Sequence, residues 1–364
     1  MKNTMGQSVS LTLFGESHGP YIGAVLDGLA PGISVDEDRI RLQLSLRRPR
    51  GSYSTARVEK DSFSIVSGVF EGKTTGTPLT ILIPNQNIES RDYAETRALA
   101  RPGHADYTAY CKYHGFEDHR GGGHFSGRIT AALVAAGSVC LQALEMKGVR
   151  LGTHIASCGS VQDRSFGDIQ TDIDLLSGSR EGVLDPSIWT EMEEAINNAR
   201  REGDSLGGVL ETMITGIPAG LGEPWFDTVE GLLAHGIFSI PGIKGVQFGP
   251  AFELVKERGS VYNDSFRMEG GAPITETNHN GGINGGITNG MPIHILTAVK
   301  PTPSISQPQQ TVDFIRGEEA VLFVKGRHDP AIIHRVRVVV DSICALVLCD
   351  LLAQRFGTDF LRAT

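Results

Sequence analysis

The segment ITAALVAAGSVCLQALEM, at residues 129–146, limits the fold more than any other. Wound as a helix, it is apolar on nearly every side, and such a helix belongs in the interior of a protein. Its uncharged part, 131–144, is shorter than the ~20 residues that a membrane span needs. Lys147 and Gly148 then supply the residue types that favour a helix C-terminus. The segment therefore predicts a buried helix of a globular protein.

Other helices and strands are mixed along the chain. We predict helices at 36–48, where Ser34 or Asp36 can cap and Pro49 stops the helix, after Asp185-Pro186 as far as Gly203, and at 336–356. Apolar patterns predict strands at 9–14, 63–70, 79–83, 209–217 and 293–299. This mixture indicates an α/β or α+β protein. A length of 364 residues fits two domains or one large one, and no segment resembles a linker.

Charge and cysteine content narrow the function classes. The chain has 33 Lys and Arg residues against 42 Asp and Glu residues, which argues against a general nucleic-acid or anionic-membrane surface. Its five cysteines form no CxxC and no zinc spacing, so we interpret them as reduced thiols and predict no metal. The N-terminal MKNTMGQSVS lacks the apolar core of a signal peptide. We therefore expect a soluble, cytoplasmic protein.

A group of arginines follows the first predicted helix: Arg47, Arg48, Arg50 and Arg57. Cations at a helix end are often only a solvated surface that complements the helix dipole. Here the arginines continue past Pro49, where no helix dipole explains them. Guanidinium groups suit bidentate contacts with carboxylates and phosphates. The pattern favours an anion site over a solvated helix end.

Two histidines in glycine-flanked turns are candidates for acid–base chemistry: His18 in GESHGP and His104 in RPGHADY. A lone histidine is more often structural, but imidazole is the usual general acid or base near neutral pH. Arg101 lies close enough in sequence to hold an anion beside His104. In GRHDP, Asp329 has two open interpretations, a cap for the following helix or an ionised base.

Glycine-rich loops such as NHNGGINGG (278–286) suggest backbone that approaches a flat or phosphorylated ligand. KPTPS (300–304) adds a lysine and two hydroxyls in a turn spaced by prolines. No P-loop, Rossmann glycine motif, HExxH or GxSxG is present. The residues alone thus predict an enzyme with arginine-lined anion sites, two candidate histidines and glycine loops around a large ligand.

Ten segments, taken together and in this order, resemble the chorismate synthase family. They are GESHG (15–19), LRRPRG (46–51), SGVFEGKTTGTP (67–78), RPGHADY (101–107), RGGGHFSGR (120–128), EGDSLGG (202–208), GIPAGLGEP (216–224), NHNGGINGGI (278–287), KPTPSI (300–305) and GRHDP (326–330). Each segment is weakly specific by itself. Ten of them across nearly the whole chain make a specific match.

The resemblance implies a lyase of the shikimate pathway of aromatic amino acid biosynthesis. Such enzymes convert 5-enolpyruvylshikimate 3-phosphate to chorismate and phosphate by an anti 1,4-elimination that requires reduced FMN. The implied fold is α+β, a β-α-β sandwich with a helical layer between two antiparallel four-stranded sheets, in a single domain spanning 1–364. The implied assembly is a homotetramer, with an external flavin reductant and no nucleic-acid or membrane partner.

The resemblance also implies roles for residues in the matching segments. His18 would protonate the leaving phosphate or the substrate side, His104 would stay protonated beside the reduced flavin, and Asp329 would work with the flavin to remove the proton at carbon 6. Substrate anions would contact Arg47, Arg57, Arg101 and Arg128. FMN would contact His124, Phe125, Ser126, Gly242, Gly285, Lys300, Pro301, Thr302, Pro303, Ser304 and Arg327.

The chain departs from the family pattern on the cofactor side. After the triple glycine the family usually has Arg-Ser-Ser-Ala-Arg, whereas this chain has His124-Phe125-Ser126-Gly127-Arg128. Pro241-Gly242 stands where the family often has Asn-Ala. We therefore expect an intact set of catalytic residues with its own variant of FMN binding. Two alternatives stay open: a flavin- or anion-binding homologue without turnover, and an unrelated phosphate lyase without flavin.

Overall fold

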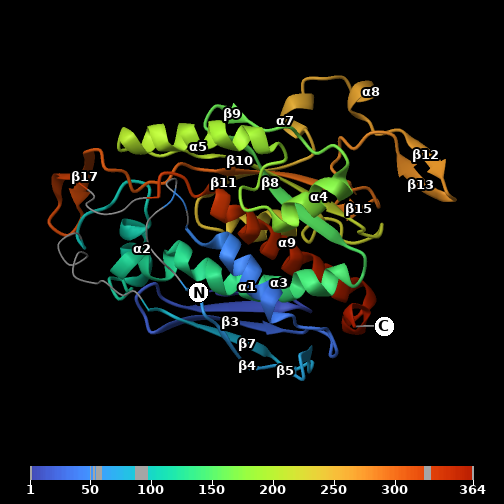
Figure 1. Cartoon of the computed structure of the whole chain (residues 1–364), viewed down its shortest axis with the longest axis horizontal. Helices are drawn as coiled ribbons and strands as arrows, with labels where there is room; N and C mark the ends of the chain where they lie inside the picture. The colour runs from blue at the N-terminus through green and yellow to red at the C-terminus, as the bar shows by residue number, and fades with distance from the viewer. Residues whose placement is uncertain are drawn as a thin grey trace.

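The computed structural model describes residues 2–49, 51, 54, 60–86, 97–323 and 329–362. Figure 1 shows a layered molecule in which long helices lie between two antiparallel sheets, while other helices cover the outer face of one sheet. This arrangement is the α+β sandwich with a central helical layer that the resemblance predicted, so that prediction is confirmed.

The first sheet has the order β1-β2-β3-β7-β4, with β1 (Thr4–Met5), β2 (Ser10–Gly15), β3 (Tyr21–Asp27), β7 (Leu79–Pro84) and β4 (Ser64–Ser67). The second has the order β11-β16-β10-β8-β9, with β11 (Ile243–Phe248), β16 (Ile293–Val299), β10 (Gly208–Thr215), β8 (Arg150–Cys158) and β9 (Val161–Gln162). Each sheet therefore holds the four longer strands expected, and the described residues add a two-residue strand, β1 or β9, at one edge.

The central layer is formed by α1 (Glu37–Arg47), α3 (Thr130–Glu145) and α9 (Ile333–Phe356), which pack against one another between the sheets. Every residue of α3 from Ala131 to Leu144 is buried, which confirms the predicted interior helix. A Cβ atom on Gly137 would lie 2.3 Å from Cβ of Ser342 on α9. Glycine at 137 therefore allows the two central helices to approach closely.

The remaining elements lie around this sandwich. The helices are α2 (Asp106–Tyr113), α4 (Ile169–Gly178), α5 (Pro186–Arg201), α6 (Val229–Phe238), α7 (Ala251–Leu254) and α8 (Gly259–Tyr262), with 3-10 turns at Arg120–Phe125, Gly127–Ile129 and Thr358–Leu361. The small hairpins are β5 (Val69–Phe70) with β6 (Lys73–Thr74), β12 (Phe266–Glu269) with β13 (Ala272–Thr275), β14 (Ile283–Asn284) with β15 (Ile287–Thr288), and β17 (Gln309–Asp313) with β18 (Glu318–Leu322).

Most element predictions are confirmed. Asp36 and Asp185 cap α1 and α5 as expected, and the strands predicted at 9–14, 79–83, 209–217 and 293–299 are β2, β7, β10 and β16. The single strand predicted at 63–70 is wrong, because Gly68 divides it into β4 and β5. Gly68 has a φ of +82°, and a Cβ there would lie 2.4 Å from Cα of Leu79. Helix α9 also begins earlier than predicted, at Ile333.

One apolar cluster joins both sheets and the helices between them, from Val9 on the first sheet side to Leu361 near the C-terminus. This continuity supports the single domain that the resemblance implies, which stays a prediction. The segment Gly127–Glu145 is long and apolar enough to cross a membrane, but its residues are 83% buried inside the fold. In this structure the segment serves as a core helix.

A buried polar cluster lies across three strands of the second sheet. His154 donates from Nε2 to Glu211 (2.7 Å) and from Nδ1 to Asp163 (3.1 Å), and His294 donates to the other oxygen of Glu211 (2.8 Å). Burial would raise the pKa of Glu211, but the hydrogen bonds from both histidines lower it to about 2. Burial would lower the pKa of His154, but hydrogen bonds to Asp163 and Glu211 raise it. The cluster is therefore a buried set of paired charges.

This cluster predicts a pH window for stability. The contribution of Glu211 is complete above its ordinary pKa of 4.5 and is lost as the pH falls toward 2. The contribution of His154 is complete below its ordinary pKa of 6.5 and is lost as the pH rises through its raised value. Glu211→Gln should thus lower the free energy of unfolding by roughly 1–3 kcal/mol between these two pH values, and by less outside them. Urea unfolding across the pH range measures this, with the exposed Glu318→Gln as control. An equal loss at pH 9 would contradict the account.

Candidate active site

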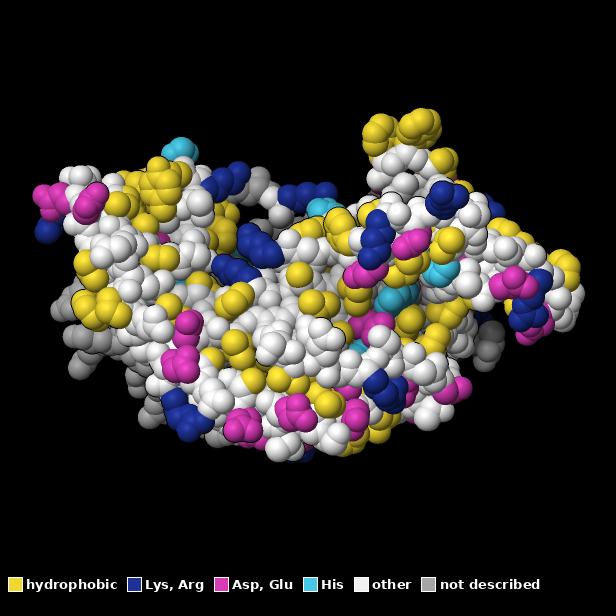
Figure 2. Space-filling model, turned by 90° about the horizontal axis from the view of Figure 1, so that it is seen from above, with side chains coloured by type: hydrophobic (Ala, Val, Ile, Leu, Met, Phe, Trp, Pro, Cys, Tyr) yellow, Lys and Arg dark blue, Asp and Glu magenta, His cyan; other side chains and the backbone are white. Residues whose placement is uncertain are grey.

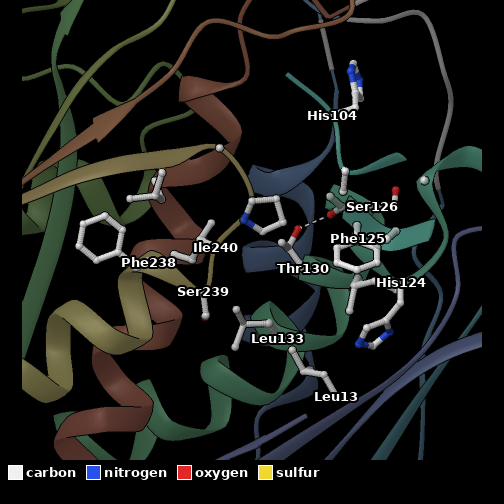
Figure 3. A pocket seen from close by; sticks show the side chains of 18 of the residues that line it. Leu13, His104, His124, Phe125, Ser126, Thr130, Leu133, Phe238, Ser239 and Ile240 are labelled. Atoms are coloured by element: carbon white, nitrogen blue, oxygen red, sulfur yellow. Dashed lines mark hydrogen bonds between the residues drawn. The ribbon is translucent and has the colours of Figure 1, made fainter. Parts of the chain in front are cut away.

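A cavity of about 920 Å³ lies at the edge of the helical layer (Figure 3). Its walls come from the start of α3, the 3-10 turn at Arg120–Phe125, the end of α6 and the segment that follows β16. His104 lies at one end of the view, and Leu13 and Leu133 lie at the other, with Phe125 and Ile240 between them. The cavity therefore combines a polar end with an apolar interior, as sites for flat organic ligands do.

His104 is held at the polar end by two contacts. Its Nδ1 donates to the carbonyl of Pro102 (3.2 Å), and its Nε2 lies 2.9 Å from Oγ of Ser304. Because a carbonyl only accepts, Nδ1 carries a proton, and in the neutral ring Nε2 accepts from the serine hydroxyl. Burial, Arg101 and Lys300 lower the pKa of His104 to about 4, against smaller opposing effects of the Pro102 carbonyl and Asp106. The free protein thus holds a neutral imidazole at pH 7, whereas the resemblance implied a protonated one.

Basic side chains lie near this end of the cavity. Lys300 donates to the carbonyl of Gly103 (2.6 Å), and burial together with Lys244 lowers its pKa. Lys244 also lines the cavity. On the face seen in Figure 2, Lys and Arg side chains gather around a hollow, although the chain as a whole has a net charge of −9. The local charge favours an anionic ligand.

The triple glycine shapes the wall next to His18. Gly121, Gly122 and Gly123 all have positive φ angles, and Ser17 donates its backbone N–H to the carbonyl of Gly123 (3.0 Å). A Cβ on Gly121 would lie 2.1 Å from Cε1 of His18. The glycines therefore make room for the buried His18 ring against the lining segment, a role different from cradling a phosphate.

Several of the arginines predicted to bind anions lie together in a buried cluster, and its centre is Asp61. This carboxylate is 0% exposed and contacts Arg47 (3.3 Å), Arg48 (3.5 Å) and Arg128. Burial would raise the pKa of Asp61, but Arg47, Arg128 and Arg48 together lower it. The solvated-surface interpretation of Arg47 is wrong, because its side chain is only 2% exposed. The structure thus brings two predicted substrate arginines, Arg47 and Arg128, to one point.

Arg101, another predicted substrate arginine, pairs with a different carboxylate. Arg101 makes a bidentate pair with Asp106, from Nε (2.8 Å) and Nη2 (2.6 Å), beside His104 at the cavity. Arg57 lies outside the described residues, as do Arg50 and the predicted FMN contact Arg327. In the described structure, Arg101 is therefore occupied by a neighbouring carboxylate.

Asp329 is linked to the same arginine cluster from the other side. Its Oδ1 accepts from Oγ of Ser54 (2.8 Å), and its Oδ2 accepts from Arg335. Arg335 in turn donates from Nε to the carbonyl of Arg47 (2.9 Å). Helix α9 is flanked by Ile332 at its start and has no side-chain cap there, so the helix-cap interpretation of Asp329 is wrong. Its carboxylate is buried beside the arginine cluster.

The predicted FMN contacts are only partly at the cavity. The lining includes His124, Phe125, Ser126, Gly242, Lys300, Pro303 and Ser304. His124 donates from Nδ1 to the carbonyl of Gly15 (2.8 Å), so this donor faces the protein backbone. Phe125 is 42% exposed and meets Tyr113 edge-on at 6.0 Å. The ring of Phe125 therefore offers an aromatic surface to a ligand.

Three predicted contacts do not line the cavity: Pro301, Thr302 and Gly285. Thr302 lies in the turn next to Pro303, and its carbonyl accepts from Ser205 (2.7 Å). Gly285 belongs to the β14–β15 hairpin, away from the cavity lining.

Two buried hydroxyls, Oγ of Ser17 and Oγ1 of Thr302, have no hydrogen-bond partner in the described part of the chain. Such groups are usually satisfied by a ligand or by water.

Sequence reasoning missed two residues of the site. Asp61 stands in the segment EKDSF, which matches no motif, and nothing in its neighbours marks it as the partner of three arginines. Arg335 lies in an apolar helix, where a buried cation needs a partner. That second signal could have been used, because Asp329 precedes it closely in the sequence.

The chain is similar to one family of known proteins over most of its length. The family model of chorismate synthase matches residues 9–353. The chain is 42% identical to chorismate synthase of Thermococcus kodakarensis over 96% of this chain and 97% of that protein, and 45% identical to that of Aeropyrum pernix over 97% and 93%.

A crystal structure of chorismate synthase aligns with a TM-score of 0.77 and 29% identity, covering 97% of this chain and 94% of that one. These matches run through both sheets and the helical layer, and they include the segments that carry His18, His104 and the arginine cluster. The predictions of an enzyme and of its family are both confirmed. The chain belongs to the chorismate synthase family.

Proposed function

We propose that the protein converts 5-enolpyruvylshikimate 3-phosphate to chorismate and phosphate by anti 1,4-elimination, with reduced FMN, in the shikimate pathway. The observation that carries this proposal is the buried arginine cluster around Asp61, which adjoins Asp329 through Arg335 and Arg47. A substrate with a phosphate and two carboxylates needs several fixed guanidinium groups. An elimination also needs a proton acceptor beside them, and the Asp329 carboxylate suits that task.

The residues present fit FMN. Leu13, Leu133 and Ile240 offer apolar walls to a flat ring, and Phe125 adds an exposed aromatic face. Lys300 supplies positive charge at the polar end. The unpartnered hydroxyl of Thr302, in the adjoining turn, would gain a partner from a ligand that reaches it. When bound, the reduced flavin would supply the electron density that lets the phosphate leave, and the protein would position and tune it.

The contacts of each group support the acid–base roles that the resemblance implies. His18, buried against the glycine turn, would donate a proton on the side of the leaving phosphate. Asp329, paired with Arg335, would accept the proton from carbon 6. Arg47 and Arg128 would hold the substrate anions, with Arg57 and Arg101 as further contacts. His124, Ser126, Gly242, Gly285, Pro301, Pro303, Ser304 and Arg327 stay predicted FMN contacts.

His104 requires an anionic ligand to become the cation that its role needs. In the free protein, burial and the neighbouring Arg101 hold its pKa at about 4. A reduced flavin anion next to the ring would act in the opposite direction and favour the protonated form. The histidine would then donate hydrogen bonds to the cofactor and stabilise its charge. Protonation coupled to cofactor binding replaces the permanently charged histidine that the resemblance implied.

We also propose where the enzyme works and how it assembles. We place it in the cytoplasm, as a homotetramer that receives its flavin in reduced form from an external reductant and has no nucleic-acid or membrane partner. The support is a biosynthetic enzyme family together with a long apolar helix that is 83% buried inside the fold. Size-exclusion chromatography with light scattering tests the tetramer.

An anaerobic assay with three arms tests the proposed reaction. Purified protein is mixed with 5-enolpyruvylshikimate 3-phosphate and chemically reduced FMN, oxidised FMN or no flavin, and chorismate absorbance is followed. We expect product only with reduced FMN. Product in all three arms would favour a flavin-independent lyase, and binding of flavin without product in any arm would favour a homologue without turnover.

A further inference from the structure

We propose that Asp61 is an internal counter-anion of the substrate site: its carboxylate holds Arg47 and Arg128 in position before substrate binds and competes with external anions for them. This inference rests on the proposed function, because it takes Arg47 and Arg128 as the substrate arginines. Asp61 would be a positioning residue, since it acts through the arginines and not on the reacting atoms.

The contacts of Asp61 converge on one buried carboxylate. Oδ2 lies 3.3 Å from Nη2 of Arg47 and 3.5 Å from Nε of Arg48, and Oδ1 contacts Nη1 of Arg128. The side chain of Asp61 is 0% exposed, and those of Arg47 and Arg128 are 2% and 6% exposed. Charged groups buried to this extent need close partners of opposite sign. Asp61 supplies that partner to both arginines at once.

The other acceptors described around these arginines are weaker. Arg47 Nη1 lies 3.4 Å from the carbonyl of Gly127 and 3.4 Å from Oγ1 of Thr130, which is beyond the usual range for a good N–H···O hydrogen bond. Arg128 Nε donates to Oδ1 of Asn85 at 3.0 Å. These acceptors are all neutral. The charged carboxylate of Asp61 contacts both arginines, so it orients them more strongly than these neutral acceptors do.

Asp61 lies among three guanidinium groups. Those of Arg47, Arg48 and Arg128 all contact its carboxylate. Asp329, a second carboxylate linked to this cluster, is engaged by Arg335 and the hydroxyl of Ser54. Guanidinium groups bind phosphates and carboxylates alike. An external phosphate would therefore compete with Asp61 for the same guanidinium groups.

The backbone of Asp61 supports a functional role. Its φ angle is +46°, in the left-handed region that few residues other than glycine, asparagine and aspartate adopt readily. The preceding residue, Lys60, accepts at its carbonyl from Arg48. Unfavourable backbone conformations persist where surrounding contacts impose them, and they gather at functional sites. Here the left-handed conformation of Asp61 places its carboxylate in contact with the arginines.

The test compares phosphate binding by Asp61→Asn with that of the wild type. Asparagine keeps the shape of the side chain and removes its charge, so inorganic phosphate should bind the vacated arginines about tenfold more tightly or better. Asp350→Asn is the matched control, because Asp350 is also buried but accepts from the backbone N–H groups of Gln7, Ser8 and Val9. Its phosphate affinity should equal that of the wild type. Isothermal titration with phosphate measures all three proteins.

Equal phosphate affinity in wild type and Asp61→Asn would overturn the proposal and leave a purely structural ion pair. If Asp61→Asn does not fold in chloride buffer, refolding is repeated in phosphate at the same ionic strength. Recovery of folded protein in phosphate alone supports the proposal, whereas equal recovery in both salts, or none in either, overturns it.

A kinetic readout separates positioning from mere stability. In Asp61→Asn, inorganic phosphate should inhibit turnover about tenfold more strongly, since product phosphate would compete better for the uncompensated arginines. Phosphate binding does not depend on turnover. If the wild type forms no chorismate but Asp61→Asn binds phosphate more tightly, the proposed reaction is wrong and the counter-anion role of Asp61 is supported. If the wild type forms chorismate but Asp61→Asn binds phosphate no more tightly, only the counter-anion role is wrong.

Discussion

Replacement of His18 by alanine should lower kcat by roughly 10²- to 10⁴-fold, the usual contribution of a positioned general acid. The ring is buried and packs against Gly121, where no side chain could be accommodated. Glycine at position 121 therefore leaves the space that the imidazole of His18 occupies. Alanine removes the proton donor and leaves the glycine turn otherwise unchanged. Anaerobic turnover with saturating substrate and reduced FMN measures the effect, together with a thermal unfolding curve for each protein.

His114→Asn is the matched control for this substitution. His114 is exposed at the end of α2, where it adopts a left-handed conformation that asparagine also tolerates. Its activity should stay within about twofold of the wild type, as expected for an exposed position. A His18→Ala protein that unfolds like the wild type and retains near-normal kcat would remove His18 from the mechanism.

Replacement of His104 by alanine should also remove most activity, by about 10²-fold or more. The reason differs from that for His18, because His104 is neutral in the free protein and would gain a proton only beside an anion. Reduced FMN should therefore bind His104→Ala about tenfold more weakly, whereas oxidised FMN, which carries no charge on its ring, should bind almost as before.

Proton uptake provides the diagnostic for His104. At pH 7 the wild type should take up protons when it binds reduced FMN, since the pKa of about 4 must rise for the imidazole to become charged. Calorimetric titrations in two buffers of different ionisation enthalpy count those protons. His104→Ala should take up fewer. Identical proton uptake by both proteins would show that His104 does not titrate with the cofactor.

The central helix and the capped helices could be predicted from sequence because their signals are local. The apolar composition of 129–146 admits only an interior helix, and α3 is buried along its length. Asp36 and Asp185 stand directly before helical patterns and cap α1 and α5. A local pattern of this kind needs no knowledge of its neighbours in space.

Strand β8 was missed because its stability depends on distant partners. Its sequence RLGTHIASC places the polar residues Thr153 and His154 side by side, yet both are fully buried. Thr153 donates to Asp341 on α9, and His154 donates to Glu211 on β10. No sequence pattern near β8 predicts these partners. Buried polar strands are recognisable only once the fold has brought their acceptors close.

In the site, too, local features could be predicted from the sequence but contacts between distant residues could not. Histidines in glycine turns and clustered arginines predicted the kind of chemistry, but only the fold shows that Arg47 and Arg128 share Asp61 while Arg101 pairs with Asp106. His124, which departs from the family pattern, illustrates what the sequence alone could not predict. In sequence it stands where the family usually has an arginine, and in space its Nδ1 donates to the carbonyl of Gly15. Electrostatic partners far apart in sequence are set by tertiary structure.

One anaerobic progress curve tests the central claim most directly. Chorismate, released phosphate and the redox state of the flavin are followed together, with substrate in large excess over reduced FMN. The proposed elimination predicts equal amounts of chorismate and phosphate, many turnovers for each flavin, and a flavin that is still reduced when substrate is exhausted. Product limited to one equivalent of flavin, with the flavin oxidised in step, or no chorismate at all, would contradict the account.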